Sequence, residues 1–363
     1  MTRCLTVGSA TQDTIAIIEN KSLSYATAEI KNHVIGWKEG SKIEIEKLLV
    51  KEGGGAINSA LCLSSLQHAV SCHFAIGQDL VGKTILATLA QDSIQTFPLK
   101  IETAPSGTAF VIPIPKHDRL ILYHQGANSF LSQKTFPSKL IETHDFLYIS
   151  PLHGNALSLV PWLSFEFKKQ HDSTTLRIAY NPSIEHVVST TFKGILPSID
   201  LLILNQEEMI LCMAHLVSRF FVSSKKGIFS HGPLLTQKIF SYQKMTFTLY
   251  EFCKEILSYG IKRILVTDGA QGAYAITKDT LYYHPALPTP ITNTLGAGDV
   301  FGSTFFSFII EGKKIEDALR AATIHAASTI QHHGIREGLL TKKQLEKKIT
   351  TLDTSLLYTT DFR

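Results

Sequence analysis

The sequence Asn293-Thr-Leu-Gly-Ala-Gly-Asp299 leads directly into the apolar run Val300-Phe-Gly-Ser-Thr-Phe-Phe-Ser-Phe-Ile-Ile310. The run predicts a buried helix, which places the glycine-rich segment at the N-terminus of that helix. Unpaired backbone N–H groups and the helix dipole both favour an anion at such an end. Gly296 and Gly298 would let the backbone approach the anion closely. Asp299 could accept a proton from an attacking hydroxyl, but Asp before an apolar run also serves as a plain helix cap.

Upstream of this segment, short apolar runs alternate with stretches of helical periodicity. This alternation is typical of an α/β fold, and continuously apolar runs indicate strands that are covered on both faces of a parallel sheet. A helix is expected at 56–66. Strands are predicted at 5–7, 73–76, 146–149, 177–180, 201–204 and 263–266.

Two regions depart from this alternation of predicted strands and helices. Polar and apolar residues alternate within 14–51 and again within 108–124, as in Lys42-Ile-Glu-Ile-Glu46. Strands with one polar face predict a small sheet beside the main body, and an irregular surface excursion is the alternative. Residues 216–244 are weakly periodic and rich in Ser, Lys and Gly, so we interpret them as an insertion.

Composition narrows the classes of function. The net charge of +4 over 363 residues is small and the basic residues are dispersed, which argues against a nucleic-acid partner. No apolar run reaches the roughly 18 residues of a membrane span, and no leader is evident at the N-terminus. The five cysteines are scattered without a C-x-x-C pair, which indicates buried thiols and a cytoplasmic protein.

Six segments together resemble the ribokinase-like (PfkB) sugar and nucleoside kinases. The segment that ends at Asp299 is similar to the family's D-T-x-G-A-G-D signature. The order and spacing of all of them agree with the family from about residue 4 to residue 345. The other five are Gly8 with Asp13, Glu52-Gly-Gly-Gly-Ala-Ile-Asn58, Gly126-Ala-Asn128, Asn205-Gln-Glu-Glu208 and Val266-Thr-Asp-Gly-Ala-Gln-Gly272.

The resemblance implies a ribokinase-like three-layer α/β/α fold with a mainly parallel central sheet and a small β-lid. It also implies transfer of the γ-phosphoryl group of ATP to a hydroxyl, with Mg²⁺. The main domain would be discontinuous, the lid would close over the sugar, and a homodimer through the lid is expected. The expected ranges are 1–13, 52–107 and 125–345 for the main domain, 14–51 and 108–124 for the lid, 216–244 for the insertion and 346–363 for a C-terminal tail.

The resemblance also assigns site residues. Asp299 would be the general base, with the backbone from Leu295 to Gly298, including Gly296 and Ala297, as the anion hole. Glu208 would hold Mg²⁺ through water. The acceptor would be bound by Asp13, Gly53, Gly54, Asn58, Asn128 and Asn181. The nucleotide would be bound by Asn205, Thr267, Gly269, Gly272 and His325, although His325 could equally be a packed core histidine.

One departure concerns Asn293, where the family signature has an Asp that commonly helps to bind a monovalent cation. The amide keeps an oxygen but loses the charge, so dependence on potassium is left open. Alternatives to a sugar kinase also stay open at this point. A nucleoside kinase of the same fold would stack its substrate on lid aromatics such as Tyr25, Trp37 or Phe110, and a binding protein without turnover is the third hypothesis. A Rossmann-type dehydrogenase is excluded because no G-x-G-x-x-G follows the first strand.

Overall fold

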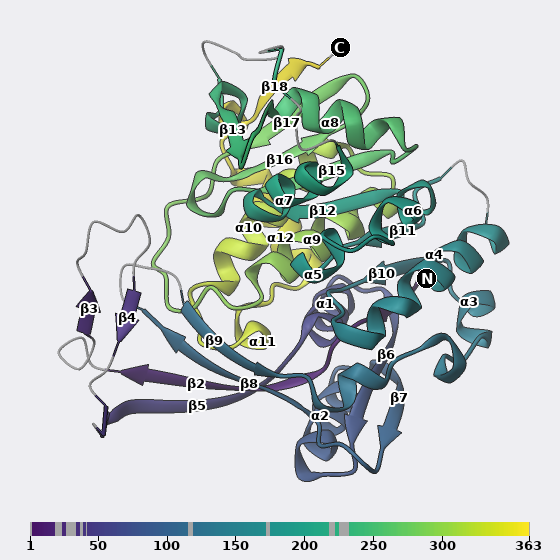
Figure 1. The fold of residues 1–363 in the computed structure, drawn as a ribbon, viewed down its shortest axis with the longest axis vertical. Coiled ribbons are helices and arrows are strands. Elements are labelled where there is room, and N and C mark those ends of the chain that lie inside the picture. Colours follow the sequence, from purple (N-terminus) through teal and green to yellow (C-terminus); the bar gives the residue numbers. More distant parts are fainter. Residues whose placement is uncertain are drawn as a thin grey trace.

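The computed structural model describes residues 2–18, 24–26, 34–36, 39–40, 42–114, 119–171, 175–217, 222–224 and 232–362. Figure 1 shows one large sheet between two layers of helices and a smaller sheet that projects to one side. Within the large sheet the neighbouring strands from β15 to β7 are all parallel. The predicted three-layer α/β fold with a mainly parallel central sheet is therefore confirmed.

The large sheet has the strand order β18-β17-β16-β15-β12-β11-β10-β1-β6-β7. All six predicted strands are present. Three antiparallel strands at one edge, β16 to β18, and the opposite edge strand β7 were not predicted. The bounds are β1 (Arg3–Val7), β6 (Ala69–Gly77), β7 (Gln95–Ile101), β10 (Phe146–Ile149), β11 (Ile178–Tyr180), β12 (Leu201–Asn205), β15 (Arg263–Thr267), β16 (Ala273–Ile276), β17 (Thr280–His284) and β18 (Tyr358–Asp361).

Two hydrophobic cores flank this sheet. Successive strand residues point to opposite faces, so Leu147 and Ile149 of β10 enter one core and Tyr148 enters the other. The first core includes α4, α7 and α8, and the second includes α1, α2, α9, α10 and α12. The bounds are α1 (Gly55–Ser65), α2 (Leu80–Gln91), α3 (Lys139–Thr143), α4 (Leu159–Gln170), α5 (Ile184–Val187), α6 (Phe192–Ile195), α7 (Gln206–Leu216), α8 (Leu249–Ser258), α9 (Ala297–Ile310), α10 (Ile315–Thr329), α11 (Ile335–Gly338) and α12 (Lys342–Thr351).

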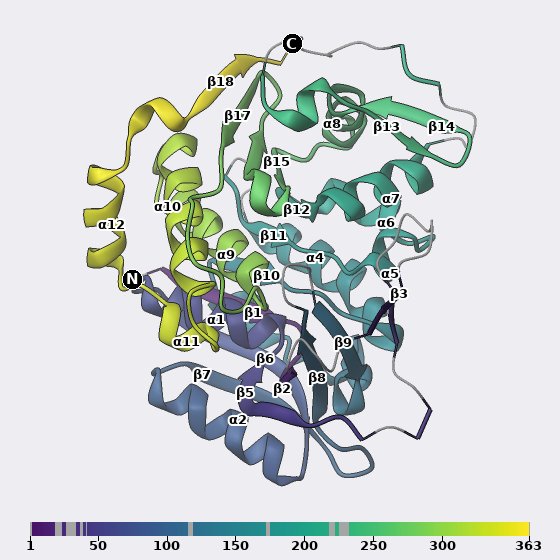
Figure 2. The ribbon, with the colours of Figure 1, turned by 90° about the vertical axis from the view of Figure 1, so that its left-hand side faces the viewer.

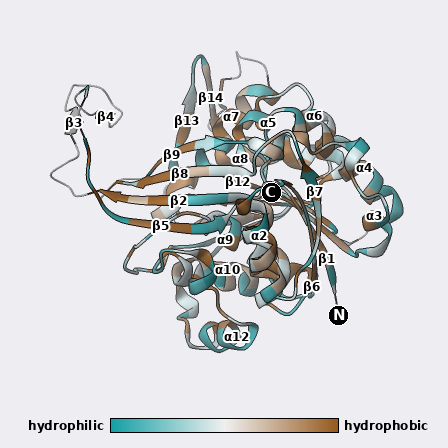
Figure 3. Ribbon diagram, turned by 90° about the horizontal axis from the view of Figure 1, so that it is seen from below, coloured by the Kyte–Doolittle hydropathy of each residue, from teal (hydrophilic) through white to brown (hydrophobic). Residues whose placement is uncertain are grey.

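The smaller sheet has the order β5-β2-β8-β9, and a separate pair is formed by β3 and β4. Figure 3 shows apolar stretches along the strands of the four-stranded sheet. One cluster of buried residues in this sheet, which includes Ile15 and Val111, packs against Leu295 and so connects the sheet to the glycine-rich segment. The bounds are β2 (Thr11–Ile18), β3 (Ser24–Ala26), β4 (Val34–Gly36), β5 (Ile45–Gly53), β8 (Gly107–Pro113) and β9 (Arg119–His124).

The expected insertion and tail both contain regular structure. Within 216–244, the described residues include β13 (Ile239–Tyr242), which forms a hairpin with β14 (Met245–Thr248) and buries Phe240 in the first core. The rest of that region is only partly within the described residues. The C-terminal segment runs along the outside of the molecule from α12 to β18 (Figure 2), where it pairs with β17.

The structure also tests the predictions about the cysteines and about membrane-spanning segments. All five cysteines are buried thiols, as predicted. Among the described residues, no helix combines the length and the apolar composition that crossing a bilayer requires.

Candidate active site

The glycine-rich segment forms the N-terminus of α9, as the sequence predicts. Gly296 is the N-cap in the left-handed region, with φ of 70°, and a Cβ there would lie 2.1 Å from Cδ1 of Ile335. A Cβ on Gly298 would meet nothing within 4 Å, so open space lies beside this turn. The backbone N–H groups of Gly296, Gly298 and Asp299 have no acceptor among the described residues. These donors at a helix N-terminus form an anion site.

Asn293 modifies the predicted anion hole. Its Oδ1 accepts a hydrogen bond of 3.0 Å from the N–H of Leu295, and its Nδ2 donates one of 2.8 Å to the carbonyl of His333. The N–H of Ala297 donates to the carbonyl of Thr294 at 3.3 Å. The N–H groups of Leu295 and Ala297 are therefore occupied within the turn, and the donors available to an anion begin at Gly296 and extend to Asp299.

Asp299 lies in the first turn of α9 and is half-buried. Its Oδ2 accepts a hydrogen bond of 2.7 Å from Nδ2 of Asn58 in α1. Burial raises the pKa of Asp299, and the Asn58 hydrogen bond and the positive charge of Arg119 oppose this shift. A carboxylate with a raised pKa is a stronger base than an exposed one, which suits acceptance of a proton from a hydroxyl.

Asp13, Gly53 and Gly54 meet where β2 pairs with the end of β5. A Cβ on Gly53 would lie 2.1 Å from Oδ2 of Asp13, so this pairing requires glycine. Gly54 has φ of 93° and lies against the carbonyl of Ser9. Burial raises the pKa of Asp13 to about 6; a hydrogen bond from Thr11 opposes the shift and the charge of Asp299 adds to it.

The predicted nucleotide-side residues lie at the carboxyl ends of neighbouring strands. Asn205 ends β12 and pairs in register with Thr267, which ends β15. Gly269 and Gly272 follow in the turn to β16, with φ of 54° and 112°. A Cβ on Gly272 would clash with the carbonyl of His284, whereas Gly269 borders open space. Ligands of parallel α/β sheets bind at this edge, so the placement agrees with the predicted role.

Asn205 and Glu208 form a capping box at the start of α7. The side chain of Asn205 accepts from the Glu208 N–H, and the Glu208 carboxylate accepts from the Asn205 N–H, both at 2.8 Å. The pKa of Glu208 is raised to about 7, mainly by burial; the hydrogen bond from the Asn205 N–H opposes the shift, and the charges of Glu207 and Asp299 add to it. Carboxylates that raise one another's pKa by repulsion favour a divalent ion near them.

The donor set constrains how such an ion would bind. Among the described residues, no group of three His, Cys, Asp or Glu side chains is arranged to hold a metal. A hydrated Mg²⁺ keeps several waters and takes few protein ligands, and the carboxylate of Glu208 is an oxygen ligand of the kind that it prefers.

Three predicted side chains have partners within the protein. The Oδ1 of Asn128 accepts a hydrogen bond of 2.9 Å from the Ala10 N–H, and its Nδ2 donates one of 2.8 Å to the Ala10 carbonyl. Asn128 therefore holds the loop after β1. The Nδ2 of Asn181 donates to the carbonyl of Ile203 at 3.1 Å. The side chain of His325 has no exposed surface, and its ring nitrogens bind Thr304 and the N–H of Leu340. Contact between His325 and a nucleotide was therefore a wrong prediction, because this ring is a packed core residue.

Arg119 was missed by the sequence analysis. It begins β9 in the smaller sheet and donates a hydrogen bond of 2.9 Å to Oγ1 of Thr294, next to the anion site. Only the register of the β8–β9 hairpin places this cation there, and no local pattern signals it. Tyr123 of the same strand pairs with Ala109, which pairs with Asp13, so both side chains lie on one face of the smaller sheet.

Comparisons with known proteins agree with this geometry. The profile of the pfkB family of carbohydrate kinases matches residues 19–220 and 243–342. A ribokinase of Haemophilus influenzae is 22% identical over 334 residues, covering 89% of this chain and 97% of that protein. A deoxyribokinase of Salmonella typhimurium is 22% identical over 315 residues, covering 86% of this chain and 92% of the other.

Solved structures share the fold. Arabidopsis thaliana ribokinase with ribose and ATP has a TM-score of 0.70 at 19% identity, covering 96% of this chain and 99% of that one. A Burkholderia thailandensis nucleoside kinase with inosine has a TM-score of 0.69 at 16% identity, covering 96% and 98%. An Escherichia coli protein in complex with ATP and Mg²⁺ has a TM-score of 0.71 at 16% identity, covering 97% and 100%.

Proposed function

Because this chain belongs to the pfkB family of carbohydrate kinases, and is therefore a phosphotransferase with an alcohol group as acceptor, we propose that it uses ATP to phosphorylate a small sugar or sugar acid. The observation that carries the proposal is the arrangement of Asp299 beside the open N–H groups of Gly296 and Gly298. A proton acceptor and an anion site are thereby joined in one helix turn, as transfer of a phosphoryl group to a hydroxyl requires.

Asp299 acts as the general base in this proposal. Asn58 holds Oδ2, which leaves Oδ1 without a hydrogen-bond partner among the described residues. The acceptor hydroxyl donates its proton to Oδ1 as its oxygen attacks the γ-phosphorus and the bond to the ADP oxygen breaks. The backbone N–H groups of Gly296, Gly298 and Asp299 stabilise the charge on the phosphoryl oxygens in transit.

The acceptor lies between the two sheets. Asp13 accepts hydrogen bonds from its hydroxyls, and Gly53 and Gly54 let it lie against the backbone. Asn58 and Asn181 complete the polar surroundings, and Asn128 acts indirectly by holding the loop at Ala10. The smaller sheet serves as a lid, and Arg119 brings a positive charge to Thr294 when the lid lies over the site.

ATP occupies the edge formed by Asn205, Thr267, Gly269 and Gly272. Glu208 would hold Mg²⁺ through water, and Asn205 supports Glu208 by the capping box; the metal would supply positive charge at the phosphates. A monovalent cation does not fit beside Asn293. The Nδ2 of Asn293 already donates to the His333 carbonyl. An amide donor therefore occupies the position that a cation bound by an acidic side chain would take.

The decisive experiment is a screen for phosphate transfer from ATP over a panel of sugars, sugar acids and nucleosides. Turnover of a sugar or sugar acid supports the proposal. Turnover of nucleosides alone establishes the second candidate function, a nucleoside kinase. That alternative is favoured by Tyr123, whose ring is 39% exposed, lies 5.6 Å from the ring of His153 and shares a face with Asp13. If no acceptor is turned over, the result favours the third hypothesis, a binding protein without turnover.

A second copy of the chain is a further part of the proposal. The edge strands of the smaller sheet expose apolar side chains, with Leu48 55%, Val50 51% and Leu122 57% exposed. We expect these residues to be covered in a homodimer formed through the smaller sheet. Sedimentation of wild type and Leu122→Lys tests this: a wild-type dimer that the variant dissociates supports it, and a wild-type monomer contradicts it.

A further inference from the structure

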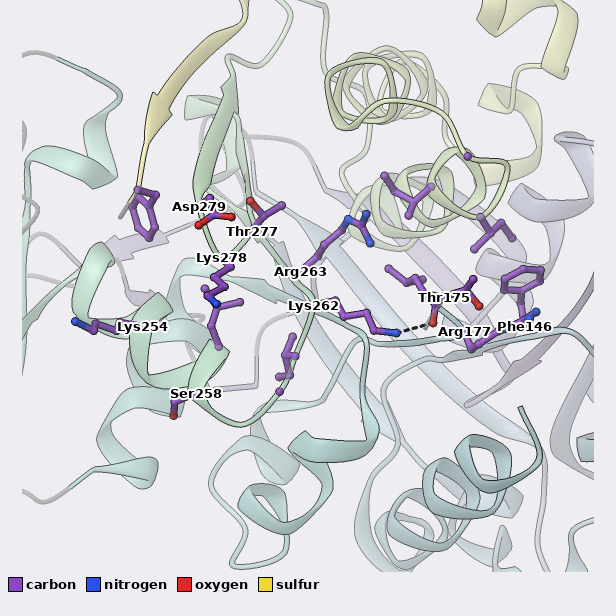
Figure 4. A pocket seen from close by; sticks show the side chains of 18 of the residues that line it. Phe146, Thr175, Arg177, Lys254, Ser258, Lys262, Arg263, Thr277, Lys278 and Asp279 are labelled. Atoms are coloured by element: carbon purple, nitrogen blue, oxygen red, sulfur yellow. Dashed lines mark hydrogen bonds between the residues drawn. The ribbon is translucent and has the colours of Figure 1, made fainter. Parts of the chain in front are cut away.

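A cavity of about 1200 Å³ lies on the other side of the molecule from the candidate active site. It is lined by the beginning of β10, the segment before β11, the beginning of β15, α8 and the C-terminal end of α9 (Figure 4). These strands run parallel, and the candidate active site is at their carboxyl ends. The cavity is therefore at the opposite edge of the sheet, and the proposed reaction uses none of its residues.

The cavity concentrates positive charge. Five of its lining residues are basic and one, Asp279, is acidic. Lys262 is neutralised by Asp200, at 2.9 Å, and also donates to the carbonyl of Thr175. Within the described part of the chain, none of the other four forms an ion pair. Those four are Arg177, Lys254, Arg263 and Lys278.

Two of these cations are only partly exposed. The Nε atoms of Arg177 and Arg263 are buried and have no acceptor. Burial lowers the pKa of Arg263, because its charge is removed from water without full compensation. Buried donors without partners are uncommon, and an anion at the guanidinium groups would offset their charge. Arginine is the side chain best suited to phosphate, because its planar donors match two oxygens at once.

Much of the remaining lining is apolar, although Thr175, Ser258 and Thr277 also contribute to it. The guanidinium of Arg177 lies over the ring of Phe146, with Cζ 5.1 Å from the ring centroid. Figure 4 shows both side chains at the same end of the cavity. Leu176, Ile261, Ile309 and Phe362 also line the cavity. Cavities that bind small ligands combine such apolar walls with a few charged groups, and their usual volumes are roughly 300–1,000 Å³. We propose that this cavity binds a small organic phosphate with an apolar or aromatic body, as a ligand site separate from the site of phosphoryl transfer.

The test is calorimetric titration of the full-length protein with 1-naphthyl phosphate, which has an aromatic body and one phosphate. Glycerol phosphate and inorganic phosphate serve as probes without the apolar body. The double variant Lys254→Gln/Lys278→Gln removes two exposed charges of the cavity, and Arg263→Gln removes a deeper one. The matched control, Lys169→Gln/Lys347→Gln, removes two exposed lysines outside it.

We expect 1-naphthyl phosphate to bind at least ten times more tightly than the other two probes. Each cavity variant should raise its dissociation constant about tenfold, whereas the control double variant changes it less than twofold. Phosphoryl transfer from ATP should be unaltered in Lys254→Gln/Lys278→Gln. Equal dissociation constants in the cavity and control variants would place the probe elsewhere and overturn the proposal. Equal affinity for all three probes would contradict the proposal that the ligand has an apolar or aromatic body. If Arg263→Gln does not fold, the double variant Lys254→Gln/Lys278→Gln tests the proposal by itself.

Discussion

Asn58 donates a hydrogen bond of 2.7 Å to Asp299, although 241 positions separate them in the chain. The bond joins the first turns of α1 and α9, the two helices that begin with the glycine-rich segments. It fixes one carboxylate oxygen and leaves the other without a hydrogen-bond partner among the described residues. In the proposed mechanism, this second oxygen receives the proton of the acceptor hydroxyl, and the base is oriented by the helix that also contributes to the acceptor side.

The first prediction follows from this pair. In Asp299→Asn the new amide oxygen can still accept from Asn58, so the fold and the binding of ATP should change little. The proton acceptor is lost, and the rate of phosphoryl transfer should fall by about 10²–10⁴-fold. Steady-state rates and calorimetric ATP titration measure the two effects, with Glu346→Gln on the surface of α12 as control. A variant that keeps more than about a tenth of the wild-type rate would remove Asp299 from the role of base.

A second prediction contrasts two glycines of one turn. Open space surrounds Gly298, so Gly298→Ala should fold and gain roughly 0.5 kcal/mol of helix stability. Its methyl group occupies the anion site, and the transfer rate should fall about 10²-fold, as for loss of one anion-hole donor. Gly296→Ala instead meets Ile335 and requires a positive φ, so its melting temperature should drop. A fully active Gly298→Ala would show that the phosphate lies elsewhere.

The third prediction concerns the metal. Glu208→Gln keeps the capping box, because glutamine can also accept from the N-cap N–H, but it removes one charge. The Mg²⁺ concentration for half-maximal rate should rise several-fold. The melting temperature should not fall, and above pH 7 it should rise, because a buried charge whose pKa is raised to about 7 is removed. Glu346→Gln, on the surface of α12 and away from the acidic residues of the site, is the control. If the Mg²⁺ dependence of Glu208→Gln matches that of wild type, Glu208 is only a helix cap.

The fourth prediction tests the amide at position 293. Because Nδ2 of Asn293 already satisfies the His333 carbonyl, the wild-type rate should be equal in potassium and in tetramethylammonium salts. Asn293→Asp places a carboxylate against that carbonyl, and the repulsion should lower its melting temperature unless potassium is present. Thermal unfolding in the two salts measures this without reference to turnover. Potassium stimulation of the wild-type enzyme would contradict the assignment.

The sequence analysis succeeded where a local pattern has one structural solution. Apolar runs became parallel strands, and the glycine-rich segment before Val300 became a helix N-terminus. It failed where the outcome depends on long-range pairing. Strand β18 forms only because β17 offers an unpaired edge, and Arg119 reaches Thr294 only through the hairpin register. For His325 the sequence leaves a nucleotide contact and a core position open, and for Asn128 it does not show that Ala10 already binds the side chain.

The last prediction separates function from stability at Asp13. Burial raises its pKa from 3.8 to about 6, so the folded chain holds this proton more tightly than the unfolded chain. The free energy of unfolding therefore falls as pH rises between these values and stays lower above them. Asp13→Asn removes this cost. At pH 7.5 it should raise the free energy of unfolding by up to about 3 kcal/mol, with no gain near pH 3.

The same change, Asp13→Asn, removes a charged partner for acceptor hydroxyls, worth about 2 kcal/mol, so the acceptor KM should rise roughly 30-fold. Denaturant unfolding at the two pH values and acceptor kinetics at pH 7.5 measure both effects, with Glu346→Gln as control. A variant that is stabilised but has an unchanged acceptor KM would make Asp13 a buried strand residue rather than a substrate ligand. An unchanged stability would show that the fold already compensates its charge.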